Sequence, residues 1–212
     1  MIRFPEKSEY NVYDLVKLIE ILRSPEGCPW DREQTHESHR RDVLEEAYEV
    51  AEAIDERDSA HLKEELGDLL MAVIFHTQIE LESGGFNIDA VADNTVRKLI
   101  YRHPHVFGDT VAEDSTEVLR NWDKLKKTER SEETLADTLN NVARSLPALW
   151  RSEKIINKIK KSGAELEIDD GEVTEEIIGN SLLKAVKTAY EQGIDPEYAL
   201  HSACERIIAK YS

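Results

Sequence analysis

The sequence DVLEEAYEVAEAI, residues 42–54, places apolar side chains three and four positions apart and sets acidic side chains between them. The sequence HLKEELGDLLMAVIFHT, residues 61–77, comes six residues later and has the same spacing. Apolar residues at these intervals lie along one face of an α-helix, and that face is expected to pack against a core. Because the connection is short, the two stretches predict a pair of antiparallel helices.

The same periodicity continues on both sides of this pair, and no stretch alternates in the way that a half-buried strand does. The protein is therefore expected to be all-α. Helices are predicted at 9–23, 37–57, 60–82 with Ser59 as its N-cap, 88–102, 115–130, 147–162, 173–192 and 195–211. The polar stretch 131–141 is typical of a linker, and Asp169-Asp170-Gly171 is expected to interrupt the helices.

Acidic residues far outnumber basic ones, with 44 Asp and Glu against 27 Lys and Arg, a formal net charge of −17. Such a surface repels nucleic acid and anionic lipid, so neither is expected as a partner. The longest apolar run, Leu69–Phe75, is too short to span a bilayer. No secretory signal is visible, and the two cysteines, Cys28 and Cys204, form no disulfide framework. We therefore expect a cytoplasmic protein.

More than half of the excess negative charge is concentrated between residues 42 and 68, which hold 11 acids and two bases. On a helical wheel Glu45 lies on the solvated side, as expected of an ordinary acidic helix. Two pairs differ from that pattern, because they border the apolar face at a spacing of three residues: Glu46 with Glu49, and Glu65 with Asp68.

If the two helices pack together, these four carboxylates converge at a partly buried rim. Like charges at close range are costly unless a cation offsets them. Oxygen ligands suit Mg²⁺, with Mn²⁺ as the alternative, and the absence of Cys and His from the set disfavours Zn²⁺. From spacing alone, a pair of helices that is merely acidic remains the competing interpretation.

The motifs EExxE (Glu45 to Glu49) and ExxD (Glu65 to Asp68) resemble the signature of the MazG family of nucleoside triphosphate pyrophosphohydrolases. The likeness spans about residues 12–150. It includes the segments GCPWD (27–31), QT (34–35), EELGDLL (64–70), RHPHVF (102–107) and SLPAL (145–149). The resemblance implies an antiparallel helix bundle of the MazG and dimeric dUTPase type, and a homodimer.

The resemblance also implies Mg²⁺-dependent hydrolysis of a nucleoside triphosphate to the monophosphate and pyrophosphate. The metal ligands would be Glu46, Glu49, Glu65 and Asp68. The basic residues that contact phosphate would be Lys98 and Arg102, and Trp122 matches a tryptophan near the nucleotide.

Basic residues for a triphosphate are also found without the resemblance. Lys98 and Arg102 are four residues apart and share a helix face, although an ordinary solvated basic face has the same pattern. The stretch 120–130 holds five bases and two acids, and Lys126 is the favoured candidate there. No glycine-rich phosphate loop is present, so the chemistry is expected to rely on metal-activated water, with Glu45 or Glu49 accepting its proton.

Similar segments in the two halves of the chain predict an internal repeat. Residues 66–71 resemble 178–183, and 86–102 align with 194–210, although two amphipathic helices can look alike by chance. The second copy has Ile177 and Asn180 in place of Glu65 and Asp68. We expect a catalytic helical domain at 1–130, a linker at 131–146 and a shortened, degenerate second repeat at 147–212. The competing functional hypothesis is a non-catalytic dimerisation or regulatory module that keeps an acidic relic.

Overall fold

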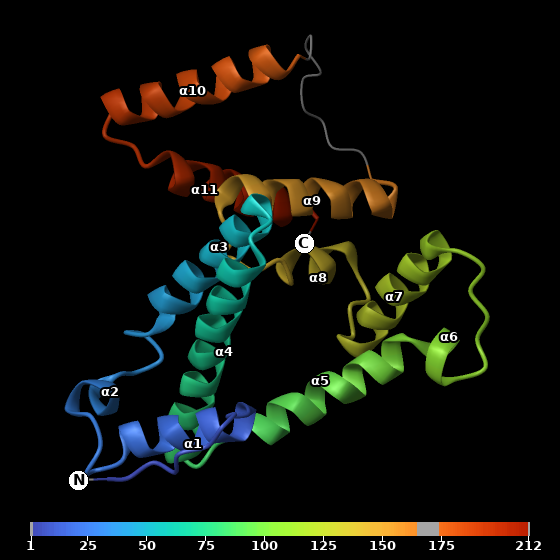
Figure 1. Ribbon diagram of the computed structural model, residues 1–212. Helices are drawn as coiled ribbons and strands as arrows, with labels where there is room; N and C mark the ends of the chain where they lie inside the picture. Colours follow the sequence, from blue (N-terminus) through green and yellow to red (C-terminus); the bar gives the residue numbers. More distant parts are fainter. Residues whose placement is uncertain (1, 165–173, 212) are drawn as a thin grey trace. The chain divides into compact units, whose positions relative to one another are not determined.

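The computed structural model of the chain describes residues 2–164 and 174–211 (Figure 1). Throughout these two ranges every regular element is an α-helix, which confirms the expected all-α class. None of the described helices is long and apolar enough to cross a membrane. The chain divides into two compact units, residues 1–100 and residues 101–212.

The first unit is organised around a helical hairpin. Its helices are α1 (Val12–Arg23), α2 (Pro29–Glu33), α3 (Arg40–Glu56), α4 (Ser59–Glu82) and the greater part of α5 (Ile88–Arg102). As predicted, α3 and α4 lie side by side (Figure 1). The reversal between them needs only two residues, because Arg57 takes a left-handed conformation with φ 57°. Asp58, not the expected Ser59, caps α4 by accepting hydrogen bonds from two backbone N–H groups.

The core of this unit forms where α1 packs on the C-terminal half of α4. It buries Ile19 of α1 against Ile74, Phe75 and Ile79 of α4. Further towards the hairpin turn, apolar side chains that were expected to face a core remain exposed: Leu44 and Tyr48 on α3, and Leu66, Leu70 and Val73 on α4. The reason is that α3 and α4 cover each other along one side only, so part of each apolar stripe has no covering element among the described residues of the first unit.

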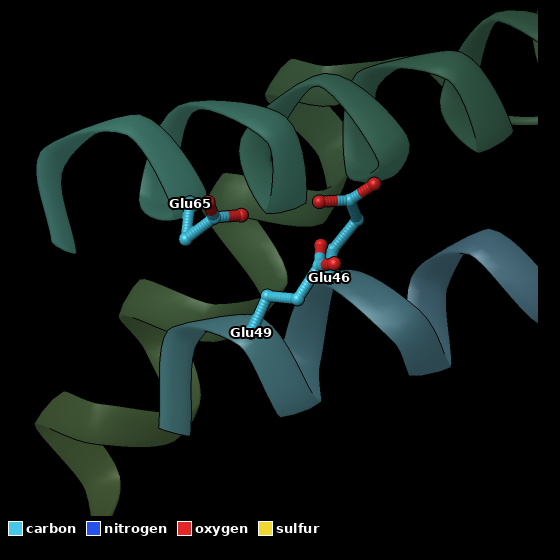
Figure 2. Close-up of side chains that lie close together, drawn as sticks. All are labelled: Glu46, Glu49 and Glu65. Carbon is cyan, nitrogen blue, oxygen red and sulfur yellow. The ribbon is translucent and has the colours of Figure 1, made fainter. Parts of the chain in front are cut away.

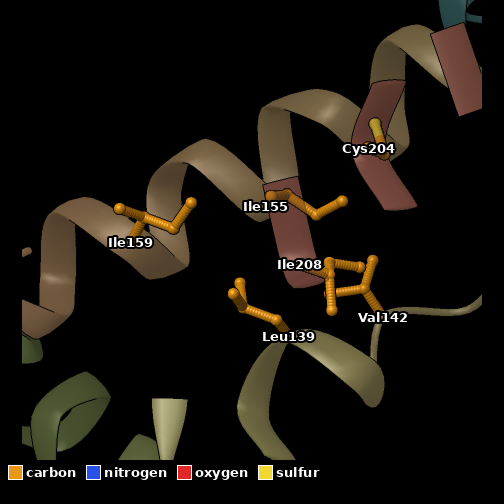
Figure 3. Close-up of a cluster of buried hydrophobic side chains, with 6 residues drawn as sticks. All are labelled: Leu139, Val142, Ile155, Ile159, Cys204 and Ile208. Carbon is orange, nitrogen blue, oxygen red and sulfur yellow. The ribbon is translucent and has the colours of Figure 1, made fainter. Parts of the chain in front are cut away.

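The second unit contains α6 (Pro104–Phe107), α7 (Ser115–Glu129), α8 (Leu135–Asn140), α9 (Ala148–Ser162), α10 (Glu175–Glu191) and α11 (Pro196–Ala209). Its core is built from α8, α9, α11 and the residues just after α8 (Figure 3). The buried side chains are Leu139, Val142, Ile155, Ile159, Cys204 and Ile208.

The segment expected to be a linker, 131–146, contributes to this core. Thr134 and Asp137 form a capping box that starts α8, and Leu139 and Val142 are buried. Three short helices, α2, α6 and α8, were not predicted, because they are too short to show a period. The break expected at Asp169-Asp170-Gly171 lies outside the described residues, and the predicted repeat and the domain limits at 130 and 146 stay predictions.

Candidate active site

The α3–α4 hairpin brings three of the four predicted metal-binding carboxylates together. Glu46 and Glu49 lie one turn apart on α3, and Glu65 approaches them from α4 (Figure 2). One carboxylate oxygen from each lies within 4.8 Å of the others. Helical geometry is sufficient to produce this convergence. The three-residue spacing places Glu46 and Glu49 on one edge of α3, and the short turn brings Glu65 of α4 to face them. We call these three residues the acidic cluster.

The acidic cluster is partly withdrawn from water. Glu65 is buried, with 8% of its surface exposed, and Glu46 and Glu49 are half-buried. Burial and then the negative charges of Asp68, Glu49 and Glu65 raise the pKa of Glu46. Burial and the charge of Glu49 likewise raise the pKa of Glu65, and His61 opposes part of that rise. The cluster therefore carries an electrostatic cost that a bound cation would remove.

The two other acids predicted for the site differ from each other. Asp68 is half-buried one turn beyond Glu65, and its charge contributes to the raised pKa of both Glu46 and Glu65. It lies near the acidic cluster, although outside the tight group of three. Glu45 is exposed and makes a long contact of 3.9 Å with Arg41, so it lies on the solvated side of α3, as the helical wheel predicted.

His61 is a neighbour of the acidic cluster that the sequence did not reveal. Its Nε2 lies 3.1 Å from Glu65 Oε1, and its Nδ1 lies 3.0 Å from Glu56 Oε2. The hydrogen bond with Glu56 raises the pKa of His61. The imidazole thus links the end of α3 to Glu65 on α4. Its spacing of four residues from Glu65 is an ordinary helical contact, and only the hairpin turn explains its contact with Glu56.

The donor set identifies the kind of cation that the acidic cluster fits. Three carboxylates from two helices place oxygen atoms within 4.8 Å of one another, and Asp68 adds negative charge beside them. Oxygen-only donor sets are typical of hard divalent cations. The residues present are therefore suited to such a cation.

The predicted phosphate-binding residues fall into two groups. Lys98 is half-buried on α5 and belongs to the first unit with the acidic cluster. Arg102, Trp122 and Lys126 belong to the second unit, where the structure places them close together. The guanidinium of Arg102 lies 5.3 Å from the centre of the Trp122 ring, and the charge of Arg102 contributes to a lowered pKa of Lys126, which is chiefly due to burial.

Two further residues complete this second group, and sequence reasoning missed both roles. Glu129 accepts hydrogen bonds from Arg102 at 2.8 Å, which fixes the guanidinium against Trp122. The ring of His103 packs edge-on to Trp122 with ring centres 4.9 Å apart. Trp122 and Glu129 are seven residues apart, which places them on one face of α7. This spacing was the feature of the sequence from which their proximity could have been predicted.

Comparison with known proteins gives a consistent result. Residues 34–107 match the model of the MazG nucleotide pyrophosphohydrolase domain. The chain is 37% identical over 216 residues to the nucleoside triphosphate pyrophosphohydrolase/pyrophosphatase MazG of Thermotoga maritima, covering 93% of this chain and 83% of that protein. It is 35% identical over 222 residues to the nucleoside triphosphate pyrophosphohydrolase of Escherichia coli, covering 93% of this chain and 84% of the relative.

Two other similarities cover less. The chain is 44% identical over 153 residues to the uncharacterized protein YabN of Bacillus subtilis, but it spans only 31% of that protein. A crystal structure of a MazG-related protein from Thermotoga maritima aligns with 54% of this chain and 98% of its own, with 29% identity and a TM-score of 0.46. The domain match and the relatives aligned over most of their length show that this chain belongs to the MazG family of nucleotide pyrophosphohydrolases, which are hydrolases.

Proposed function

We propose that this chain hydrolyses a nucleoside triphosphate, ribose or deoxyribose, to the monophosphate and pyrophosphate, and that it requires Mg²⁺, with Mn²⁺ as the alternative. The observation that carries the proposal is the convergence of Glu46, Glu49 and Glu65 within 4.8 Å. Their mutual repulsion and burial favour a bound divalent cation. The relatives that are named nucleoside triphosphate pyrophosphohydrolases support the choice of substrate.

In this proposal Glu46, Glu49, Glu65 and Asp68 hold the metal. A bound Mg²⁺ would lower the pKa of a water molecule and offset the charge of the triphosphate. The cationic side chains of Lys98, Arg102 and Lys126 contact phosphate oxygens, and the ring of Trp122 stacks on the nucleotide. Because Glu129 already pairs with Arg102, a phosphate must compete with this carboxylate for the guanidinium.

The reaction adds water across the anhydride that joins the α and β phosphorus atoms. The water oxygen bonds to one of these atoms while the bond from that phosphorus to the bridging oxygen breaks, and a carboxylate takes the proton of the water. Glu49 and Glu45 are the candidates for this base. Attack at either phosphorus gives the same products, so isotopically labelled water is needed to show which product receives its oxygen.

We also propose that the chain acts as a homodimer. The exposed apolar side chains of α3 and α4 lie beside the acidic cluster in sequence, and a second copy that covered them would shield the site from water. The cytoplasmic location and the lack of a nucleic-acid partner remain predictions from the cysteine usage and the net charge of −17.

The test is release of pyrophosphate from a panel of nucleoside and deoxynucleoside triphosphates, with and without Mg²⁺ or Mn²⁺. We expect turnover that depends on the cation. If no member of the panel is hydrolysed with either cation, the competing hypothesis of a non-catalytic helical module with an acidic relic is favoured.

A further inference from the structure

The second unit contains a basic cavity that includes only one residue of the proposed substrate-binding set, Lys126. It lies between α7 and α9 and has a volume of about 760 Å³. Its basic lining consists mainly of two rows, with Arg120, Lys124 and Lys127 on α7, and Lys154, Lys158 and Lys161 on α9. We call these six residues the two basic rows. They form a local concentration of positive charge in a chain whose net charge is −17.

The acids that line the cavity neutralise little of this charge. Asp123 pairs with Lys161, with 2.6 Å between the carboxylate oxygen and Nζ. Glu132 is engaged elsewhere, since it lies 3.8 Å from Arg130 and accepts a hydrogen bond of 2.8 Å from Asn141. Among the described residues, no acid forms an ion pair with any other member of the two basic rows. Within that part of the chain, the other five cationic side chains have no ion-pair partner, although the charge of the buried Glu132 carboxylate acts on Lys158.

Lys158 is the half-buried member of the two basic rows, and the other five are exposed. Burial lowers the pKa of Lys158, and the neighbouring charges of Lys126 and Lys127 lower it further, while Glu132 and Asp123 raise it. Like-charged side chains that are held close together favour an anion between them, in the same way that clustered carboxylates favour a cation.

The spacing of the two basic rows defines the shape of the anion. Each row repeats at intervals of four and three residues, so each lies on one helix face and extends roughly 10 Å at 1.5 Å per residue. Arg120 and Lys127 lie on one face of α7, and Trp122 and Glu129 lie on the opposite face. Glu129 is the residue that pairs with Arg102. Lys126 is the only residue of the proposed substrate-binding set that also lines the cavity.

We propose that this basic cavity binds a linear chain of phosphates, as inorganic polyphosphate or as the phosphate chain of a nucleoside polyphosphate. The cavity volume is in the range of small-molecule sites and too small for a folded protein segment. Lysine and arginine bind phosphate oxygens directly as charge-assisted donors, so this site needs no metal. The proposal does not depend on hydrolysis at the acidic cluster.

The test is calorimetric titration of the full chain with inorganic tripolyphosphate in a buffer freed of divalent cations. The decisive variant is Lys158→Gln, and its matched control is Lys160→Gln, which removes the same charge two residues away on α9 from a side chain that does not line the cavity. We expect saturable binding to the unaltered chain and to Lys160→Gln, and roughly tenfold weaker binding to Lys158→Gln. Arg120→Gln, on the opposite row, should weaken binding similarly.

Two comparisons complete the experiment. Titration with ATP identifies the source of the phosphate chain. If ATP binds more tightly than tripolyphosphate, and Lys158→Gln weakens that binding too, the ligand is a nucleotide. If ATP and tripolyphosphate bind equally tightly, the ligand is a free polyphosphate. Thermal unfolding of each variant shows whether it is folded. If Lys158→Gln does not fold, Arg120→Gln replaces it as the decisive variant. The proposal is overturned if both variants bind tripolyphosphate as tightly as Lys160→Gln. A substitution in the acidic cluster that abolishes Mg²⁺-dependent turnover should leave tripolyphosphate binding unchanged. The proposed hydrolysis and the proposed basic-cavity site can therefore be refuted independently.

Discussion

Glu49 has carboxylate neighbours on both helices of the hairpin, Glu46 on its own helix and Glu65 on the next. Replacing it with Gln removes one ligand charge and keeps the shape of the side chain. We expect Glu49→Gln to lower kcat/KM by more than about 100-fold, because loss of a direct ligand should exceed the usual effect of outer-shell changes. The fold should survive, since repulsion in the acidic cluster also falls. Pyrophosphate release and thermal unfolding measure the two effects.

The matched control for this change is Glu64→Gln, which removes the same charge from an exposed residue adjacent to Glu65. It should retain turnover close to that of the unaltered chain. Activity in Glu49→Gln equal to that of the control would refute the metal assignment. Glu45→Gln, measured beside them, tests the other candidate for the general base.

The raised pKa values in the hairpin predict how stability changes with pH. Glu46 and Glu65 have pKa values above the ordinary 4.5, and His61 has one above 6.5, so the folded chain holds these protons more tightly than the unfolded chain. Without metal, these three groups therefore stabilise the fold fully when the pH is below their ordinary pKa values. This stabilisation is lost as the pH rises through their raised pKa values in the folded chain.

Mg²⁺ competes with these protons, so its stabilising effect should grow as pH rises. We expect the increase in Tm caused by Mg²⁺ to be larger at about pH 7.5 than at about pH 5, as measured by thermal unfolding in both buffers. An equal increase at both values would mean that the cation binds without displacing protons from the acidic cluster.

His61 offers a separate test of how the cluster is positioned. It contacts Glu65 and Glu56 at 3.1 and 3.0 Å and carries no metal-binding role in our proposal. We expect His61→Gln to weaken the apparent affinity for Mg²⁺ by about 10-fold or more, because groups that orient a ligand have effects of that size. At saturating Mg²⁺, kcat should largely recover. A loss of kcat that added Mg²⁺ does not restore would instead indicate a direct catalytic role.

At the scale of the residue, the sequence predicted the contacts that helical geometry alone produces and missed those that depend on the turn or on another element. Glu46, Glu49 and Glu65 were predicted because three-residue spacing and a short connection suffice to bring them together. The contact between His61 and Glu56 spans the hairpin turn, which no helical period describes. The pairing of Arg102 with Glu129 joins two helices whose packing the sequence does not reveal.

At the scale of the element, the segment GCPWD is held tightly against the end of α1. A Cβ atom on Gly27 would lie 2.2 Å from the carbonyl oxygen of Ile21 and 2.3 Å from that of Leu22. Arg23, which is buried, donates hydrogen bonds to the carbonyl oxygens of Asp31 and Gln34 and pairs with Glu82 of α4 at 2.8 Å. The segment therefore joins α1, α2 and α4, and its glycine is required by close approach of the backbone.

We expect Gly27→Ala to destabilise the chain by about 3 kcal/mol, because backbone atoms must shift to admit the methyl group. The control is Gly67→Ala in the middle of α4, where a Cβ would meet nothing within 4 Å. That change should stabilise the helix by about 0.5–1 kcal/mol. Urea unfolding of both variants gives the comparison. A Gly27→Ala chain as stable as the unaltered one would show that the GCPWD segment moves without cost.

The helices longer than three turns were all predicted from the sequence to within a few residues, whereas α2, α6 and α8 were not. A short helix shows too little of the 3.6-residue period to be distinguished from a loop. Local signals were nevertheless present. Pro29 and Pro104 each occupy the first position of a short helix, and Thr134 with Asp137 forms a capping box.

At the scale of the whole molecule, the net charge of −17 is the sum of unlike regions. Residues 42–68 carry a net −9, and the structure divides their acids between a solvated side and the acidic cluster. The second unit, by contrast, contains the two basic rows around one cavity. In our two proposals, a globally acidic chain holds phosphate by two different means, through a metal at the acidic cluster and directly at the basic cavity.

The exposed apolar face of α4 provides the test of the proposed homodimer. Leu66, Leu70 and Val73 recur at intervals of four and three residues, so they form one stripe, and all three are exposed. If a second copy covers this stripe, the chain should sediment at about twice its mass of 24.3 kDa.

Val73→Glu would bury a charge in that interface, which is costly, and should shift the equilibrium towards a single chain at micromolar concentration. Val111→Glu, which adds the same charge at an exposed apolar residue between α6 and α7, should remain dimeric. An unaltered chain that sediments at the mass of one copy, with Mg²⁺ and nucleotide present, would mean that the exposed stripe has another role.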